Sequence, residues 1–236
     1  MKKNKYAICF GWILCFVAGF IEIYSFAVRG VFAAMQTGNM ITLFISLIDK
    51  NYNLSLERGI VIIGFIVGLI IAELLKPLFK KSKLSQEFWF IILEIICLIP
   101  PICIPVGTNK LSYDLSANIF IALFGAFQLS GFTSLNGNTF ISTMMTGVLK
   151  NITEHAIKTI KTKDPKEKES TLFYTFMLVF FLLGIVTSYL IIAYTHDTHL
   201  TRRLMPLMII PLLIIEIPIS LIAFSKKGDT NEKKDD

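Results

Sequence analysis

Charged residues are scarce in this chain of 236 residues. Only 17% are Asp, Glu, Lys or Arg, whereas 54% are hydrophobic. The charges cluster in residues 1–5, 76–87, 150–170 and 225–236. A soluble domain of this length cannot hide the apolar stretches between them in one core, so the lipid bilayer must solvate them. The net charge of +6 comes from basic residues that flank these stretches. That pattern is typical of membrane proteins and gives no sign of a nucleic-acid partner.

Cysteine and histidine are also rare, with four and three residues. All four cysteines lie in apolar runs without metal-ligand spacing, which favours small buried side chains over a redox or metal role. The sequence contains no HExxH, Gly-x-Ser-x-Gly or Walker lysine motif, and no paired Asp motif of the kind that membrane transferases use. We therefore expect no enzyme, no metal and no cofactor.

The long apolar runs predict an all-α, polytopic membrane protein. Two further apolar segments, 31–48 and 140–152, are interrupted or short, and we expect them to be broken or re-entrant. The tail, 225–236, is expected to be disordered. Six spans are predicted at residues 6–27, 59–79, 88–106, 115–129, 171–194 and 204–224. Polar loops are predicted at residues 49–58, 107–114, 153–170 and 195–203.

The same order of features occurs twice: a polar break, a span with a central glycine, and a span with a glutamate. Thr37-Gly38 matches Thr146-Gly147, and the same alignment without gaps pairs Met35 with Met144. The glycines and glutamates that follow are Gly68 and Gly184, then Glu94 and Glu216. The pattern predicts an internal duplication, with one membrane repeat at 1–110 and the second at 111–224.

Two topologies are compatible with the basic residues. In one, about six helices cross the membrane in two inverted repeats, and both termini are cytoplasmic. In the other, segments 31–48 and 140–152 also cross, which gives eight helices in two parallel repeats of four. Six spans are preferred because 140–152 is short for a crossing, and because Lys76, Lys80, Lys81 and Lys83 form a strongly basic loop.

Two sets of motifs resemble those of a known family. The first half carries Gly19-Phe20-Ile21-Glu22 and then Thr37-Gly38-Asn39. The second carries Gly125 with Gln128 and then Ser142-Thr143-Met144-Met145-Thr146-Gly147. In these motifs the chain resembles the YoaK-like integral membrane proteins of bacteria, a family of uncharacterised function, with Glu22 where that family more often has aspartate. The resemblance implies a multi-pass protein of the bacterial inner membrane and supplies no activity.

Three acids lie within apolar runs. An ionised carboxylate at the centre of a bilayer costs ~3 kcal/mol or more. Glu22 should therefore face a cavity, pair with a cation such as Arg29, or be protonated; alternatively it lies at the outer interface in water. Glu94 and Glu216 lie ~10–12 Å from the basic ends of their spans. That depth suits a proton-coupling carboxylate, although a hydrogen bond to a neighbouring helix would explain it equally well.

Neutral polar residues and glycines gather around the two breaks. They can line a solute site where short helices end, and half-helix N-termini would favour an anion there. The alternative is tight packing of two re-entrant elements. These candidate residues are Gln36, Thr37, Gly38, Asn39, Asn138, Thr143, Thr146 and Gly147.

Two functions follow from these features. The first is a small-solute permease or secondary transporter, in which Glu22, Glu94 or Glu216 couples transport to protons. The second is a non-transporting membrane scaffold or accessory subunit. A channel has less support, because no ring of like charges is visible. The expected partners are the lipid bilayer, a small solute and a proton; the substrate and the oligomeric state stay open.

Overall fold

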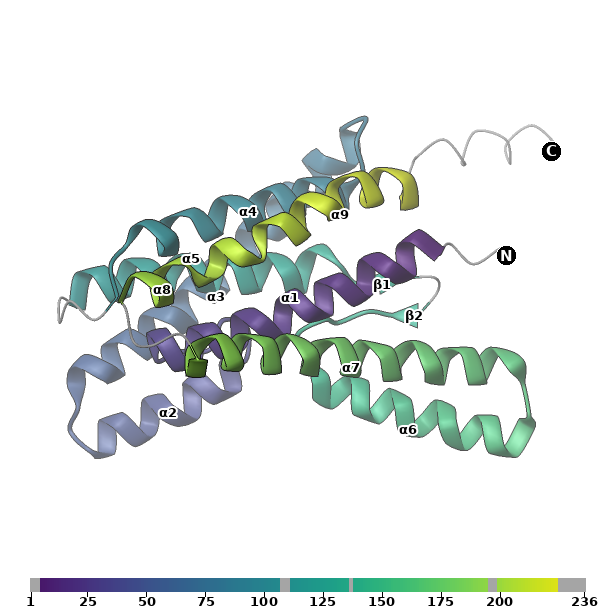
Figure 1. Cartoon of the computed structure of the whole chain (residues 1–236), viewed down its shortest axis with the longest axis horizontal. Helices are drawn as coiled ribbons and strands as arrows, with labels where there is room; N and C mark the ends of the chain where they lie inside the picture. Colours follow the sequence, from purple (N-terminus) through teal and green to yellow (C-terminus); the bar gives the residue numbers. More distant parts are fainter. Residues whose placement is uncertain (1–4, 107–110, 136–137, 195–198, 225–236) are drawn as a thin grey trace.

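The computed structural model describes residues 5–106, 111–135, 138–194 and 199–224 (Figure 1). The predicted tail, 225–236, lies outside these ranges. The fold is an all-α membrane bundle with one short hairpin. Its elements in chain order are α1 (Lys5–Arg29), α2 (Gln36–Ile48), α3 (Tyr52–Lys81), α4 (Gln86–Cys103), α5 (Leu111–Gly131), β1 (Ser134–Leu135), β2 (Asn138–Thr139), α6 (Met145–Thr162), α7 (Pro165–Tyr194), α8 (His199–Leu204), the 3-10 helix η1 (Met205–Met208) and α9 (Ile210–Ala223).

Five helical segments in the described chain are long and apolar enough to cross a membrane: α1, α3, α4, α7 and the stretch Leu200–Ala223. Helix α5 packs against α1, α3 and α4, and it turns its polar residues Asn118 and Gln128 into the bundle. Helix α2 has only 13 residues, which is ~20 Å against the ~30 Å of a hydrocarbon core. Helix α6 is too charged to be a membrane span. The eight-helix alternative therefore does not fit this fold.

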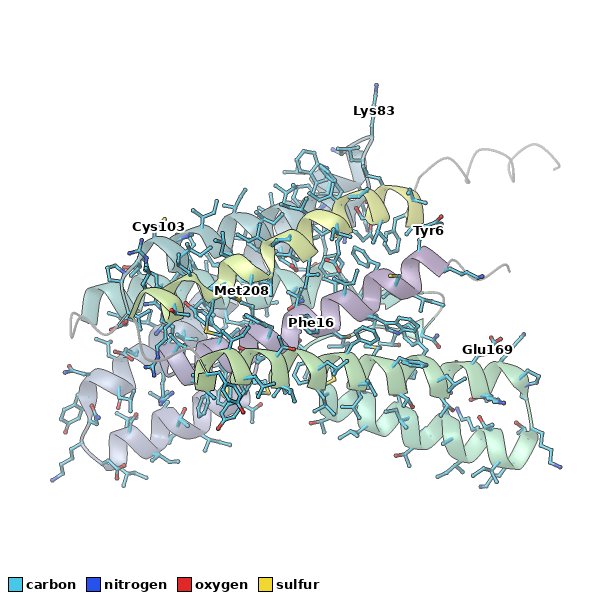
Figure 2. The ribbon with its side chains drawn as sticks, in the orientation of Figure 1. Tyr6, Phe16, Lys83, Cys103, Glu169 and Met208 are labelled. Carbon is cyan, nitrogen blue, oxygen red and sulfur yellow. The ribbon has the colours of Figure 1, made fainter. Side chains whose placement is uncertain are left out.

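The long helices alternate in direction. In Figure 1, α1, α4 and α7 run one way along the bundle, and α3, α5 and α9 run the other way. Helices α2 and α6 begin in the middle and run toward opposite ends. The start of α1, the α3–α4 connection, the α6–α7 connection and the end of α9 lie toward one end. Figure 2 labels Tyr6, Lys83 and Glu169 toward that end and Cys103 near the other.

The packing partners are exchanged between the two halves of the chain. Helix α1 packs along α7, and α3 packs along α5. Glycines permit both crossings: a Cβ on Gly19 would lie 2.1 Å from the Phe181 carbonyl oxygen, and one on Gly184 would lie 2.1 Å from that of Phe16. A Cβ on Gly68 would lie 2.7 Å from the Ala126 Cβ. Small residues thus let these helices approach closely. The boundary of the proposed repeats at residue 110 stays a prediction.

Two of the predicted loops are wrong. Most of 49–58 belongs to α3, whose N-terminus is capped by the Asn51 side chain. Most of 153–170 is also helical, since α6 continues to Thr162 and α7 begins at Pro165. We interpreted the charges of 153–170 as a loop, but they lie on the exposed faces of two helices that pack against each other. The cysteine prediction is half right: Cys15 and Cys97 are buried, whereas Cys9 and Cys103 are exposed.

Candidate functional site

One cavity lies where α2 and α6 begin. Its volume is about 470 Å³, within the range of sites for small molecules. Both halves of the chain contribute to its wall, so the structure brings together six of the predicted site residues. These six are Gln36, Thr37, Gly38, Thr143, Thr146 and Gly147. The rest of the wall is mainly apolar and comes from Phe32, Ala34, Met35, Phe65, Leu129, Ile141, Met144, Met145 and Phe181.

The two helices begin in the same way. Met35 precedes α2 and Met144 precedes α6, and methionine has no oxygen with which to cap the first turn. The Gly38 N–H donates to the Met35 carbonyl oxygen at 3.0 Å, and the Gly147 N–H donates to that of Met144 at 3.0 Å. Residues 36–39, predicted as the first break, are therefore the first turn of α2. The break itself lies at residues 30–35.

The first break is held by the Glu22 carboxylate. Its Oε1 accepts hydrogen bonds from the backbone N–H of Ala34 at 2.7 Å and of Met35 at 3.2 Å, and its Oε2 accepts one from Ala33 at 3.2 Å. Glu22 is only 2% exposed, so the alternative of an acid solvated at the outer interface is wrong. Three charge-assisted hydrogen bonds stabilise an ionised carboxylate and fix the loop. Glu22 lies behind the cavity wall and does not line the cavity.

Asn39 closes the same break from the other side. Its Oδ1 accepts from the Phe32 N–H at 2.9 Å, and its Nδ2 donates to the Phe32 carbonyl oxygen at 2.9 Å. Nδ2 also donates to Gln36 Oε1 at 2.9 Å, and Gln36 Nε2 donates to the Ala33 carbonyl oxygen at 3.1 Å. Asn39 is fully buried. Its contacts make it a structural residue of the break.

Arg29 does not pair with Glu22, contrary to the sequence prediction. Its Nη1 lies 3.4 Å from Asp114 Oδ1 at the start of α5. Its Nη2 donates to the carbonyl oxygens of Pro101 and Ile104, each at 2.9 Å. The helix of α1 ends at Arg29, because Gly30 turns the chain with a φ of +74°. The guanidinium therefore reaches the exposed C-terminal carbonyls of α4 instead of turning back toward Glu22.

The second break contains the hairpin and a buried polar turn. Strands β1 and β2 are antiparallel, with Ser134 opposite Thr139. The chain then reaches Ser142 and Thr143, which are 1% and 3% exposed. Neither hydroxyl has a hydrogen-bond partner in the part of the chain that the structure describes. Ser142 was not predicted as a site residue, although the alignment of the two breaks pairs it with Ala33, one of the donors to Glu22.

Glu94 and Glu216 lie apart from the cavity, on the contacting helices α4 and α9. Both are 0% exposed, and none of their carboxyl oxygens has a hydrogen-bond partner among the described residues. Glu94 is within electrostatic reach of Glu216, and Cys9 and Cys15 of α1 are also within reach of Glu216. The structure thus brings together two acids that the sequence placed in corresponding spans.

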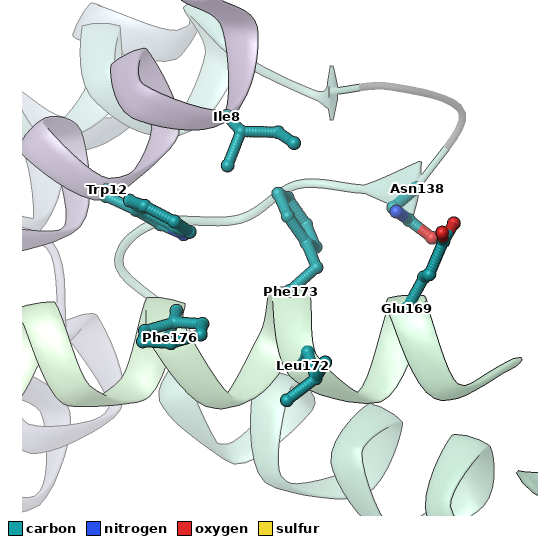
Figure 3. A pocket seen from close by; sticks show the side chains of 7 residues that line it. All are labelled: Ile8, Trp12, Asn138, Glu169, Leu172, Phe173 and Phe176. Atoms are coloured by element: carbon teal, nitrogen blue, oxygen red, sulfur yellow. The ribbon is translucent and has the colours of Figure 1, made fainter. Parts of the chain in front are cut away.

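Asn138 does not join the other candidates. It lies on β2, at a smaller cavity of about 190 Å³ between α1 and the start of α7 (Figure 3). Its Oδ1 accepts a hydrogen bond from Ser170 Oγ at 3.1 Å. Trp12, Phe173 and Phe176 make most of that cavity apolar. Asn138 therefore fixes the hairpin to α7 and is not part of the site between α2 and α6.

Comparison with known proteins identifies the family. The chain matches the model of a family described as a protein of unknown function (DUF1275) over residues 10–223. The match covers most of the chain, so the protein belongs to this family. No curated protein and no solved structure matches.

Proposed function

We propose that this member of the DUF1275 family is a small-solute permease of the bacterial inner membrane. The resemblance to the YoaK-like proteins is consistent with the family match. The observation that carries the proposal is the shared cavity. Two half-helices, one from each half of the chain, begin at the same cavity in the middle of the bundle. Transporters built from inverted repeats place the solute at this kind of junction of discontinuous helices.

The direction of the helices supports the inverted arrangement. The three long helices before residue 107 and the three after it alternate in opposite senses (Figure 1). The α3–α4 and α6–α7 connections, with the lysine-bearing helix ends that flank them, lie toward the same end of the bundle as the start of α1 and the end of α9 (Figure 1). We infer that this end is cytoplasmic, because Lys and Arg are enriched in cytoplasmic loops.

In this proposal, Glu94 and Glu216 bind the proton that is coupled to transport. A buried carboxylate without a cation or donor is costly, so two such acids together must hold at least one proton or a cation. Glu22 is excluded from this role because its two oxygens already accept three backbone N–H groups. The acid pair is separate from the cavity wall, so it would act through movement of α4 and α9 and not by touching the solute.

Flux in proteoliposomes tests the permease. The purified chain is reconstituted, and counterflow of labelled small solutes is compared with uptake driven by an inward proton gradient. We expect at least one solute to show both counterflow and proton-driven uptake. The double variant Glu94→Gln/Glu216→Gln should keep the counterflow and lose the proton-driven uptake. Glu73→Gln is the matched control, because Glu73 is an exposed acid in the second half of α3 that pairs with Lys76. Absence of both counterflow and uptake across the panel contradicts the permease and leaves the scaffold.

A further inference from the structure

The two breaks differ in one respect. In the first, the Glu22 carboxylate accepts the backbone N–H groups of residues 33–35. The alignment that pairs Met35 with Met144 places residues 142–144 at the corresponding positions. Within the described chain, the N–H groups of Ser142 and Thr143 have no acceptor, whereas Met144 closes the turn that these two residues form. The second break thus has two of the three donors of the first without the carboxylate.

The unused donors continue on both sides of Met144. The hydroxyls of Ser142 and Thr143 are buried and unpartnered. The N–H groups of Met145 and Thr146, in the first turn of α6, also have no acceptor among the residues described. Buried donors are almost always satisfied in native proteins. Ser142 and Thr143 are buried, so their unused donors indicate an acceptor outside the residues that the structure describes.

The charge that this turn favours is negative. The N-terminus of α6 carries the positive end of its helix dipole, and free N–H groups at such an end bind anions. None of the described residues that line the cavity is charged, so nothing there already neutralises this end. At the start of α2 the Glu22 carboxylate does so. The alignment pairs Glu22 with Gly131, which has no side chain, and Gln128, three residues earlier in α5, is neutral and donates to the Leu14 carbonyl oxygen at 3.1 Å.

We propose that the second break binds the carboxylate of a small organic solute that occupies the cavity. The donors are the N–H groups of Ser142 and Thr143, which correspond to those of Ala33 and Ala34 at Glu22, and the hydroxyl of Thr143, which belongs to the cavity wall. The solute carries an apolar body, because Phe65, Leu129 and Phe181 line the remainder of the cavity. The inference rests on the proposed function, since it names the class of solute for the same cavity.

Thermal unfolding of the purified full chain in detergent tests the site without any transport. Acetate, isovalerate and benzoate are each compared with the corresponding amide, which has the same shape and no charge. We expect a saturable rise in Tm with at least one carboxylate, because a ligand that binds only the folded state stabilises it. The amides should give no such rise.

Two hydroxyl deletions locate the site. Thr143→Val removes a donor to the carboxylate, and we expect it to weaken carboxylate binding by at least about tenfold. Ser188→Ala is the matched control, because Ser188 is also buried and unpartnered but lies on α7 away from the cavity lining. Neither variant should lower the Tm without ligand, since each hydroxyl lacks a partner among the described residues.

Several results would overturn the proposal. One is equal stabilisation by carboxylates and amides, and another is unchanged carboxylate binding in Thr143→Val. Stabilisation by phosphatidylglycerol together with no response to any carboxylate would mean that a lipid headgroup, and not a small solute, occupies the turn. Carboxylate binding without flux would overturn the permease and leave the carboxylate site. Flux of uncharged solutes without carboxylate binding would overturn the carboxylate site and leave the permease.

Discussion

The Glu22 Oε1 atom accepts a hydrogen bond from the backbone N–H of Ala34 at 2.7 Å, which ties the middle of α1 to the loop that precedes α2. The first prediction concerns this contact. Glu22→Gln should lower the free energy of unfolding by about 2–3 kcal/mol, because the amide keeps one acceptor and turns an NH₂ group toward backbone donors. Thermal unfolding in detergent measures the change. An unaltered Tm in Glu22→Gln would show that the three hydrogen bonds do not hold the break.

The crossing of α1 and α7 gives the second prediction. Gly19→Ala or Gly184→Ala places a Cβ against a backbone carbonyl 2.1 Å away, so the helices must separate. We expect a loss of about 1–3 kcal/mol in stability. Gly59→Ala is the control, because a Cβ there meets nothing within 4 Å and alanine favours a helix over glycine by about 1 kcal/mol. If all three variants unfold together, the close crossing is not required for stability.

Arg29 carries the third prediction. Its guanidinium donates to carbonyl oxygens at the end of α4 and lies beside Asp114. Lysine keeps the charge but cannot span these acceptors, so Arg29→Lys should cost about 1–3 kcal/mol. Lys150→Gln breaks an exposed ion pair with Glu154 and should change the Tm little. Equal effects of the two substitutions would contradict the structural role of Arg29.

The fourth prediction tests the state of the three buried acids. A hydrophobic carbodiimide reacts with protonated carboxyl groups in apolar surroundings. We expect mass spectrometry to find the adduct on Glu94 or Glu216, because neither has a hydrogen-bond partner among the described residues. Glu22 should stay unmodified, since its carboxylate is engaged by backbone donors. Labelling of Glu22 in preference to Glu94 and Glu216 would indicate that Glu22 carries the proton, and would contradict the structural role given to it.

The fifth prediction is the sidedness of two connections. Single cysteines replace Asp49, between α2 and α3, and Lys83, between α3 and α4, on a cysteine-free background. An impermeant thiol reagent added to whole cells should label the first and spare the second, because the connection that follows the lysines at the end of α3 is expected to be cytoplasmic. The reverse pattern would falsify the orientation that we infer from the basic residues.

The membrane helices could be predicted from the sequence because their signal is local. The predicted spans at 6–27 and 171–194 fall inside α1 and α7, since a bilayer requires an uninterrupted apolar run. The ends were less accurate. Charged residues at 153–170 were interpreted as a loop, but α6 and α7 extend beyond the apolar stretch and pack on each other there.

The residues of the site were predictable only where the same motif occurs in both halves of the sequence. The match of Thr37-Gly38 with Thr146-Gly147 predicted two polar breaks and so most of the polar residues of the cavity wall, although these residues belong to the first turns of α2 and α6. The partner of Glu22 was not predictable, because it consists of backbone N–H groups of a loop whose path no side-chain pattern records. Phe65, Leu129 and Phe181 were missed for another reason: in the sequence they look like any other apolar residue of a span.

The exchange of partners between the halves bears on how the molecule can move. Helices α1, α6 and α7 form one packed set, and α2, α3 and α5 form another. Each set draws on both halves of the chain, and the close contacts of Gly19 and Gly184 hold α1 against α7 within the first set. Helix α4 packs mainly on α5 and α9 mainly on α1, so a hinge between the sets would run where α1 meets α5 and where α4 meets α9. A fragment cut near residue 110 would lose a principal packing neighbour for α1 and for α3, and should not fold alone.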